Sequence, residues 1–428
     1  MPPESSFGAD AGSATDTGAD AVPATHAGNG HPTATSIVLN DTGRGTPEPV
    51  VTPEGDESGR TAAQGIRQWF LFWPVLAYLV ARAATVAGAA AFDGFTHKSL
   101  HADLYIWDGQ WFIRAALHGW PGHLPMAHGH VARNTIAFFP ALPLGIRWLT
   151  ELTRLSPLVV GLVISGVTGL TAVVAVGMLV RRYRDSPSAT RATLLFAVFP
   201  GTFVFSLAYA EGIVITCVAF GLLALLRRQW WLAGLLGLVA TAASPIALAF
   251  VLSCAWCAGR EVLRHRTWHA LIAPVLAPLG FIAYMAWLWG HTGVLSAWRL
   301  TERGGWKSGP SLTYPIHVVT TFLFNPAAPT ETGQILVAGT AVAVVGAVLA
   351  IREPQPAPVL IYGLAAGLLA AVSSPVGLRP RFIMLAFPLV LAYGIRLRGR
   401  LYTAAVVISV LLLAAMTVLE LGSTAVFP

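Results

Sequence analysis

The sequence predicts an all-α fold, in the form of a polytopic transmembrane bundle of about 11 spans. Only 11% of the 428 residues are charged, and the mean hydropathy is +0.64. From residue 69 onward, apolar runs follow one another, most of them long enough to cross the hydrocarbon core of a bilayer. Short arginine clusters separate several of these runs, as expected for loops on the cytoplasmic side of a membrane.

The first 66 residues differ in composition from the rest. They are rich in Ala, Gly, Ser, Thr, Pro and Asp and show no apolar period. Such a segment buries too little apolar surface to offset the entropy lost on ordering, so we expect residues 1–66 to be a disordered cytoplasmic tail. Residues 67–428 form the predicted integral membrane domain.

The spans can be placed and oriented together, because arginine clusters tend to stay in the cytoplasm. Clusters begin near residues 181, 227, 260 and 396, and all four fall on one side when the chain is traced through alternating spans. This assignment puts the N-terminus inside and the loop with Asp108 outside. The predicted spans are 69–92, 157–180, 190–209, a fourth that ends at Arg227, two short crossings within 230–258, 269–290, 332–351, 358–372, a tenth that ends at Arg396, and 401–419.

Three stretches need separate treatment. Residues 230–258 lie between two basic clusters, so they either cross twice as two short helices that break near Ser244-Pro245 or enter as a re-entrant hairpin. Residues 134–155 contain two prolines and then charged residues at helical spacing, which indicates a helix lying in the membrane interface rather than a span. We expect a further interfacial helix in the later outer loop, 291–331.

The most informative stretch runs from Leu104 to Ile113, because it places Asp108 between Trp107 and Trp111 just after a hydrophobic span. Tryptophans are ordinary anchors at a membrane interface, so one interpretation is an aromatic belt with an incidental acid. The functional interpretation is a general base at the membrane surface, which removes the proton of an acceptor hydroxyl as a new bond forms. Asp103 could share that site.

Glu211 directly follows an apolar run, and an acid at the edge of a span indicates a functional site because it is costly to hold in hydrocarbon. The alternative is a solvated charge at a helix end. Histidines crowd the first outer loop, but His128-Gly-His130 has no third ligand at a diagnostic spacing, so we predict hydrogen bonding there and no metal site.

Basic residues on the predicted outer side occur in two places. Arg379 and Arg381 open the tenth span, while Arg303 and Lys307 lie in the loop after the seventh. A guanidinium group at the bilayer edge can bind a phosphate in a bidentate manner. The alternative is that these long side chains only reach toward water from the interface.

Seven short motifs in this order resemble those of bacterial PIG-V-like mannosyltransferases, which belong to the GT-C superfamily of integral membrane glycosyltransferases. The resemblance runs from about residue 69 to 421, and each motif alone is weak. The motifs are Trp107-Asp-Gly-Gln-Trp111, Leu117-His-Gly-Trp120, Phe138-Phe-Pro-Ala-Leu-Pro143, Phe199-Pro-Gly-Thr-Phe203, Ala208-Tyr-Ala-Glu211, Trp230-Trp-Leu-Ala-Gly234 and Arg379-Pro-Arg-Phe382.

The resemblance implies a GT-C-like bundle that transfers a sugar, usually mannose, with inversion from a polyprenyl-phosphate donor to an extracytoplasmic glycan, glycolipid or protein acceptor. It implies that Asp108 is the base and that Arg381 binds the lipid phosphate. Ser244-Pro245 departs from the family, which usually has a basic pair there. The expected catalytic residues are Asp108 and Glu211, and the expected substrate-binding residues are Asp103, Trp107, Trp111, Tyr209, Arg379, Arg381, Arg303 and Lys307.

Such chemistry requires no cofactor, because arginines can stabilise a departing lipid phosphate, although a divalent cation is compatible with it. No nucleotide-binding fingerprint occurs, and nothing in the sequence predicts binding to nucleic acid. Two other classes stay open. A transporter or lipid flippase would place charged sites near the bilayer midplane, often in two related halves. A catalytically inactive GT-C-like scaffold would account for the departure at Ser244. In every case we expect a multi-pass protein of the cell membrane.

Overall fold

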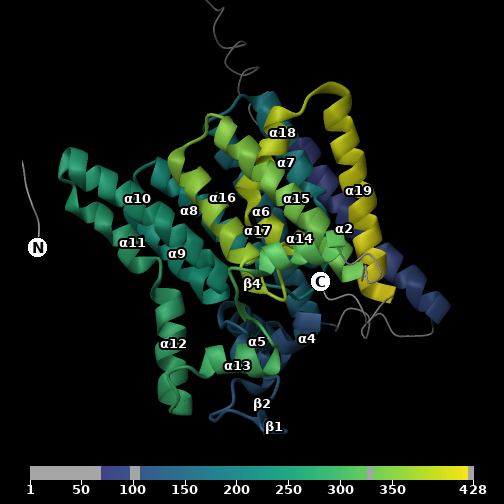
Figure 1. Cartoon of the computed structure of the whole chain (residues 1–428), viewed down its shortest axis with the longest axis vertical. Coiled ribbons are helices and arrows are strands. Elements are labelled where there is room, and N and C mark those ends of the chain that lie inside the picture. Colours follow the sequence, from purple (N-terminus) through teal and green to yellow (C-terminus); the bar gives the residue numbers. More distant parts are fainter. Residues whose placement is uncertain (1–68, 97–106, 325–330, 423–428) are drawn as a thin grey trace, which may run out of the picture. The chain divides into compact units, whose positions relative to one another are not determined.

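The computed structural model describes residues 69–96, 107–324 and 331–422, all of which belong to one compact unit spanning 55–428. These residues are almost entirely helical, which confirms the predicted all-α class (Figure 1). Two short antiparallel strand pairs accompany the helices, β1 (Met126–Ala127) with β2 (His130–Val131) and β3 (Gly309–Pro310) with β4 (Ser373–Ser374). The predicted tail 1–66 and Asp103 lie outside the described residues.

Most of the described helices follow one another with short connections, whereas residues 119–140 form a longer link between two of them. Those in the first half of the chain are α2 (Phe72–Thr96), α4 (Trp107–His118), α5 (Ala141–Thr153), α6 (Pro157–Arg181), α7 (Ser186–Ala197), the 3₁₀ helix η2 (Pro200–Ser206), α8 (Glu211–Leu226) and α9 (Trp230–Ala243). The second half contains α10 (Leu248–His265), α11 (Ile272–Leu276), α12 (Leu279–Thr292), α13 (Ala297–Gly305), α14 (Tyr314–Phe324), α15 (Glu331–Arg352), α16 (Ala357–Ala371), α17 (Pro380–Leu385), α18 (Phe387–Arg396) and α19 (Gly399–Gly422).

Four helical segments in the described part of the chain are long and apolar enough to cross a membrane, and two bent helix pairs raise the number to six. The four are 157–181, 245–265, 333–352 and 399–418. Six shorter apolar helices accompany them. This composition makes the chain a membrane protein. The count of about 11 spans stays a prediction.

Three of the predicted continuous spans are broken in the structure. The span 190–209 bends by 65° between α7 and η2, where Pro200 begins the new segment. The span 269–290 bends by 46° between α11 and α12, at Pro278. The tenth span is divided at Ala386 into α17 and α18, just before Pro388. In each case proline lacks the N–H needed to continue the helix and restricts the preceding residue.

The predicted break near Ser244-Pro245 is confirmed. α9 ends at Ala243, Ser244 is extended, and a short 3₁₀ turn (Pro245–Ala247) leads into α10. Extended geometry is what a residue before proline favours.

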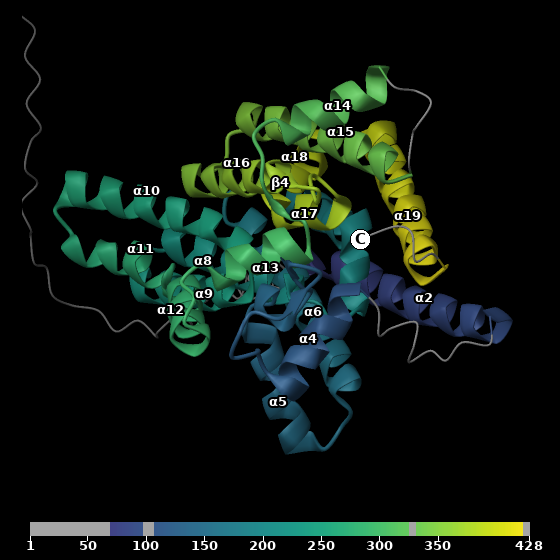
Figure 2. The ribbon, with the colours of Figure 1, turned by 60° about the horizontal axis from the view of Figure 1, so that its bottom comes forward.

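α5 and α13 are short, separate helices in the two stretches where we expected interfacial helices, and their location in a membrane interface stays a prediction. α5 exposes Trp148 (70%) and Leu152 (78%) on one side and buries Leu142 and Ile146 on the other. In a membrane protein, such an exposed apolar face can lie against lipid. Figure 2 shows α4, α5 and α13 close together at the same end of the molecule.

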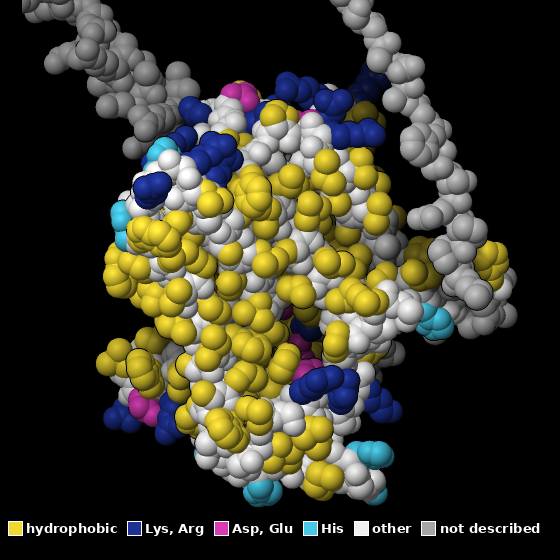
Figure 3. All heavy atoms as spheres, turned by 60° about the vertical axis from the view of Figure 1, so that its left-hand side comes forward, with side chains coloured by type: hydrophobic (Ala, Val, Ile, Leu, Met, Phe, Trp, Pro, Cys, Tyr) yellow, Lys and Arg dark blue, Asp and Glu magenta, His cyan; other side chains and the backbone are white. Residues whose placement is uncertain are grey.

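Ion pairs connect the arginine clusters in two groups. Arg184 and Arg396 both form ion pairs with Glu353, at 3.0 and 3.6 Å, and Arg228 pairs with Glu261 at 3.1 Å. Figure 3 shows basic side chains gathered at one end of the molecule, an apolar band beside them, and a hollow with acidic and basic side chains nearer the other end. This arrangement agrees with a shared side for the clusters, and their cytoplasmic location stays a prediction.

Candidate functional site

Three charged side chains from distant parts of the sequence meet at the ends of three helices. Asp108 lies in the first turn of α4, Glu211 begins α8, and Arg381 lies in the first turn of α17. Carboxylates at helix N-termini interact favourably with the helix dipole, whereas a cation there does not. Arg381 is therefore stabilised at its position mainly by the acids that face it.

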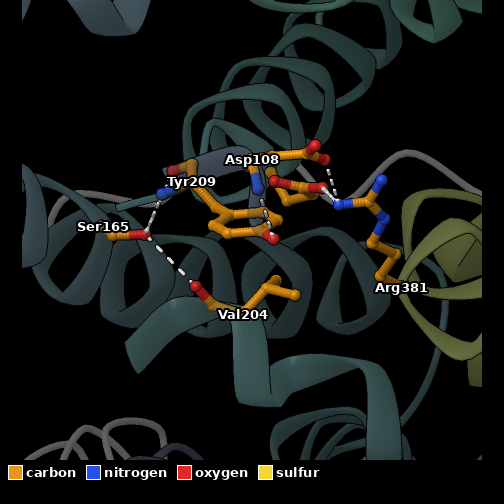
Figure 4. Close-up of polar contacts among 6 residues, drawn as sticks. Asp108, Ser165, Val204, Tyr209 and Arg381 are labelled. Atoms are coloured by element: carbon orange, nitrogen blue, oxygen red, sulfur yellow. Dashed lines mark hydrogen bonds and ion pairs between the residues drawn. The ribbon is translucent and has the colours of Figure 1, made fainter. Parts of the chain in front are cut away.

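The geometry of this cluster is compact (Figure 4). Arg381 Nη1 donates a hydrogen bond of 2.7 Å to Asp108 Oδ2 and lies 3.9 Å from Glu211 Oε1. The Arg381 guanidinium also lies over the ring of Tyr209, 5.4 Å from its centroid, and over that of Phe382, at 4.5 Å. Glu211 and Arg381 are each only 9% exposed. Buried charges in such contact stabilise one another, and removing one leaves the others uncompensated.

Tyr209 packs against the cluster of Asp108, Glu211 and Arg381. Its hydroxyl accepts a hydrogen bond from the backbone N–H of Asp108 at 3.3 Å, which ties the start of α4 to the loop before α8. The backbone of Tyr209 is held in turn by Ser165 of α6, whose Oγ lies 3.0 Å from the Tyr209 carbonyl oxygen and 3.4 Å from its nitrogen (Figure 4).

Two glycines allow the close approach of the elements that carry the cluster. A Cβ at Gly212 would collide with α6 at Thr168 and Gly169, and one at Gly201 would collide with the backbone of Pro380. The first contact places Glu211 against α6, and the second brings α17 against η2. Substitution at either glycine would therefore move an acid or the arginine.

Trp107 adds local strain beside the predicted base. Its φ is 51°, in the left-handed region that residues with a side chain rarely adopt. Strained backbone next to charged side chains is a common property of functional sites.

The cluster lines a cavity of about 870 Å³. Six α-helices (α4, α8, α9, α13, α16 and α17) contribute to its wall, and Ser244-Pro245, at the break between α9 and α10, lies there too. Its charged lining residues are Asp108, Arg133, Glu211, Arg299, Glu302, Arg303, Lys307, Arg379 and Arg381. Its aromatic lining residues are Phe112, Phe138, Phe139, Trp298, Trp306 and Phe382.

The structure brings most of the sequence-predicted site residues to this cavity. Asp108, Glu211, Arg379, Arg381, Arg303 and Lys307 line it, and Tyr209 lies beneath the cluster. Trp107 and Trp111 do not line it. Trp111 instead packs edge-on against Trp306 with centroids 5.4 Å apart and stacks with Phe138 at 6.2 Å, so it supports the wall from behind. The catalytic and binding roles of all these residues stay predictions.

Sequence reasoning did not assign Glu302, Arg133 and Trp306 to the site. Glu302 and Trp306 lie one turn apart on the same side of α13, and this helical spacing could have indicated a shared face. Arg133 lies in an irregular segment and offered no such signal. Its Nε donates a hydrogen bond of 3.1 Å to the carbonyl of Gly305, and its guanidinium lies 5.0 Å from the Trp306 ring centroid.

The described part of the chain contains no cluster of side chains suited to bind a metal ion. Within residues 69–96, 107–324 and 331–422, no group of three or more His, Cys, Asp or Glu side chains is arranged to hold a metal ion. His128 lies in the turn between β1 and β2, His130 begins β2, and both are exposed.

No family model and no curated protein matches the sequence. Three similar solved structures are of the oligosaccharyltransferase of Archaeoglobus fulgidus, with 14% identity in each case. The apo form has a TM-score of 0.44 and covers 81% of this chain and 56% of its own. The complex of AglB with an inhibitory peptide and a dolichol-phosphate has a TM-score of 0.42, with 83% and 55% covered. The form tethered to an acceptor peptide has a TM-score of 0.40, with 82% and 55% covered. The chain thus spans about half the length of the structures that it matches.

Proposed function

We propose that this protein is an integral membrane glycosyltransferase that moves a sugar, mannose in the first instance, from a polyprenyl-phosphate donor to a hydroxyl group of an acceptor. The observation that carries the proposal is the 2.7 Å contact of Asp108 with Arg381 in a cavity among apolar helices. The order of the seven motifs that resemble PIG-V-like mannosyltransferases supports the same reaction.

A carboxylate and a guanidinium side by side suit the two demands of this transfer. The acceptor oxygen forms a bond to the anomeric carbon, and the bond from that carbon to the phosphate oxygen breaks, with its electron pair leaving on the phosphate. Arg381 would hydrogen-bond the leaving phosphate through its planar fork. Asp108 would take the proton of the acceptor hydroxyl. A single displacement of this kind inverts the anomeric configuration.

Phosphate binding by Arg381 and proton removal by Asp108 compete in the observed geometry, because the two side chains form an ion pair with each other. A donor phosphate that binds Arg381 would release the Oδ2 of Asp108 for the acceptor hydroxyl. The donor would therefore bind before the base becomes free, and the acceptor second. Glu211, at 3.9 Å, would keep Arg381 partly neutralised when Asp108 turns away.

Positive charge at the leaving phosphate would come from Arg381 and Arg379, both buried in the cavity wall. The mechanism therefore needs no cofactor, and a divalent cation bound with the donor phosphate is compatible with it. A lipid donor would enter the cavity sideways from the bilayer, since apolar helices surround it. The proposed acceptor is an extracytoplasmic glycan, glycolipid or protein.

The test is transfer by the purified full chain from polyprenyl-phosphate mannose to octyl α-mannoside, with the glucose and arabinofuranose donors in parallel. Asp108→Asn should reduce turnover by about 10² to 10⁴, the usual contribution of a positioned base. Glu151→Gln is the matched control, because Glu151 is exposed and pairs with Arg147 on α5. Wild-type turnover in Asp108→Asn would refute the role of Asp108. No transfer from any of the three donors would refute the proposed reaction.

A further inference from the structure

Glu302 differs from the other two acids that line the cavity. Asp108 and Glu211 both face Arg381, within 4 Å of Nη1. Glu302 lines the same cavity from α13 and is partly buried. Among the described residues it forms no salt bridge, although Arg299 and Arg303 lie on the same helix. Ser308 hydrogen-bonds this carboxylate, but a carboxylate can accept several hydrogen bonds, so one that borders a cavity without an ion partner keeps acceptor capacity for a ligand.

α13 is held firmly, so the position of Glu302 is fixed relative to the cluster. Asn134 Nδ2 donates a hydrogen bond of 3.4 Å to Thr301 Oγ1, next to Glu302. At the end of the helix, Trp306 packs edge-on against Trp111 of α4, the helix that carries Asp108. Gly304 and Gly305 lie so close to the backbone at Val131–Arg133 that neither has room for a Cβ.

We propose that Glu302 is a further substrate-binding carboxylate, which accepts a hydrogen bond from a hydroxyl group of a sugar acceptor on the α13 side of the cavity. This inference rests on the proposed function and adds to it the binding group and the chemical class of the acceptor. The donor phosphate would occupy the Arg381 side, so the acceptor hydroxyl would lie between Asp108 and Glu302.

The aromatic side chains of this wall suit a sugar ring. Phe138, Phe139, Trp298 and Trp306 line the same cavity as Glu302, and the two tryptophans lie one helical turn before and after it. Aromatic rings suit the apolar C–H faces of a sugar ring, and a carboxylate accepts hydrogen bonds from its hydroxyl groups.

The charge of Glu302 also makes acceptor binding depend on pH. Burial, with a smaller contribution from the charge of Asp108, raises the pKa of Glu302 to about 7, while a hydrogen bond from Ser308 acts in the opposite direction. The ionised form, which accepts hydrogen bonds most strongly, therefore grows as the pH rises through 7. The other charged groups in the cavity wall are Asp108 on α4, Arg133 after β2, Glu211 on α8, Arg379 and Arg381 at the start of α17, and Arg299, Arg303 and Lys307 on or beside α13.

The first experiment measures KM for octyl α-mannoside between pH 6 and 8 in the wild type, Glu302→Gln and Glu151→Gln. In the wild type and in Glu151→Gln, this KM should fall as the pH rises through 7. In Glu302→Gln it should be about tenfold or more higher at pH 8 and independent of pH, the size expected when hydrogen bonds to a charged group are lost. KM for the lipid donor should not change in any variant. A wild-type acceptor KM and pH profile in Glu302→Gln would overturn the inference.

The second experiment needs no turnover, so it separates this inference from the proposed reaction. Dicyclohexylcarbodiimide modifies protonated carboxyl groups in apolar surroundings, and mass spectrometry can quantify its adduct on Glu302 in the purified full chain. Labelling should fall with a midpoint near pH 7, and octyl α-mannoside should protect Glu302 at pH 6.5, whereas octyl sulfate should not. Labelling that octyl α-mannoside leaves unchanged would overturn the acceptor site, even if the protein transfers sugars.

Discussion

At the scale of single residues, the stability of the site depends on Arg381. Its guanidinium compensates Asp108, whose side chain is 20% exposed, and Glu211, whose side chain is 11% exposed. We expect Arg381→Ala to lower the free energy of unfolding by up to roughly 3 kcal/mol. This is the low end of the range for breaking a buried ion pair, and we choose it because Asp108 is partly solvated. Adding Asp108→Asn to Arg381→Ala should restore part of the loss. Thermal unfolding in detergent measures both, and a double variant less stable than Arg381→Ala alone would contradict the pairing.

The same residue predicts a kinetic difference between two substitutions. Arg381→Lys keeps a positive charge but loses the planar fork that binds two phosphate oxygens, whereas Arg381→Ala loses both. We expect KM for the polyprenyl-phosphate donor to rise moderately in the lysine variant and strongly in the alanine variant, with KM for the acceptor unchanged in each. Steady-state kinetics with a fixed, saturating acceptor concentration decides this. Equal donor KM values in both variants would show that the planar, two-pronged guanidinium of Arg381 has no part in phosphate binding.

The sequence identifies reactive residue types but not their pairing. Asp108, Glu211 and Arg381 stand out in the sequence because charge is costly at the edge of an apolar run. Their mutual contact was not predictable, since Asp108 and Arg381 are 273 residues apart and meet only through the packing of α4, α8 and α17. Glu302 lies in the predicted outer loop 291–331, yet only the folded cavity shows that it forms no salt bridge with any residue that the structure describes.

At the scale of elements, α13 places Glu302 where burial makes its ionised form less stable than in the unfolded chain. Glu302 has a pKa of about 7 in the folded protein and near 4.5 when unfolded. Its stabilising contribution is therefore fully present below pH 4.5 and is lost as the pH rises through 7. Glu302→Gln lacks this titration. The free energy of unfolding of the variant, relative to that of the wild type, should therefore rise between pH 5 and 8 by at most about 3 kcal/mol, and its melting temperature should rise with it. A constant difference across this range would show that Glu302 does not titrate there.

Element boundaries also show where sequence patterns are sufficient. The break at Ser244-Pro245 and the short separate helix within 134–155 follow from proline positions and from charge spacing, and both were predictable. The bends at Pro200 and Pro278 occur at equally visible prolines. They were not predicted, because a proline inside an apolar run can kink a span without dividing it, and only packing decides between the two.

At the scale of the whole molecule, the two ends have different charge chemistry. Arg184 and Arg396 meet at Glu353, and Arg228 pairs with Glu261. Figure 3 shows basic side chains gathered at one end and a hollow with acidic and basic side chains nearer the other. Arginine-rich loops tend to remain in the cytoplasm. The cavity would then face the extracytoplasmic side, where a lipid-linked donor and a surface acceptor can both reach it.

Accessible positions at each end allow this orientation to be tested. Met126 in β1 is 62% exposed, and Gln229 between α8 and α9 is also exposed. Cysteines placed there singly, after Cys217, Cys254 and Cys257 are replaced by alanine, should react differently with an impermeant maleimide in intact cells. We expect labelling at position 126 and none at 229, with both labelled once the membrane is permeabilised. Labelling at 229 alone would reverse the orientation, and it would place the Asp108–Arg381 cluster on the side where nucleotide sugars, rather than extracytoplasmic lipid-linked sugars, are available.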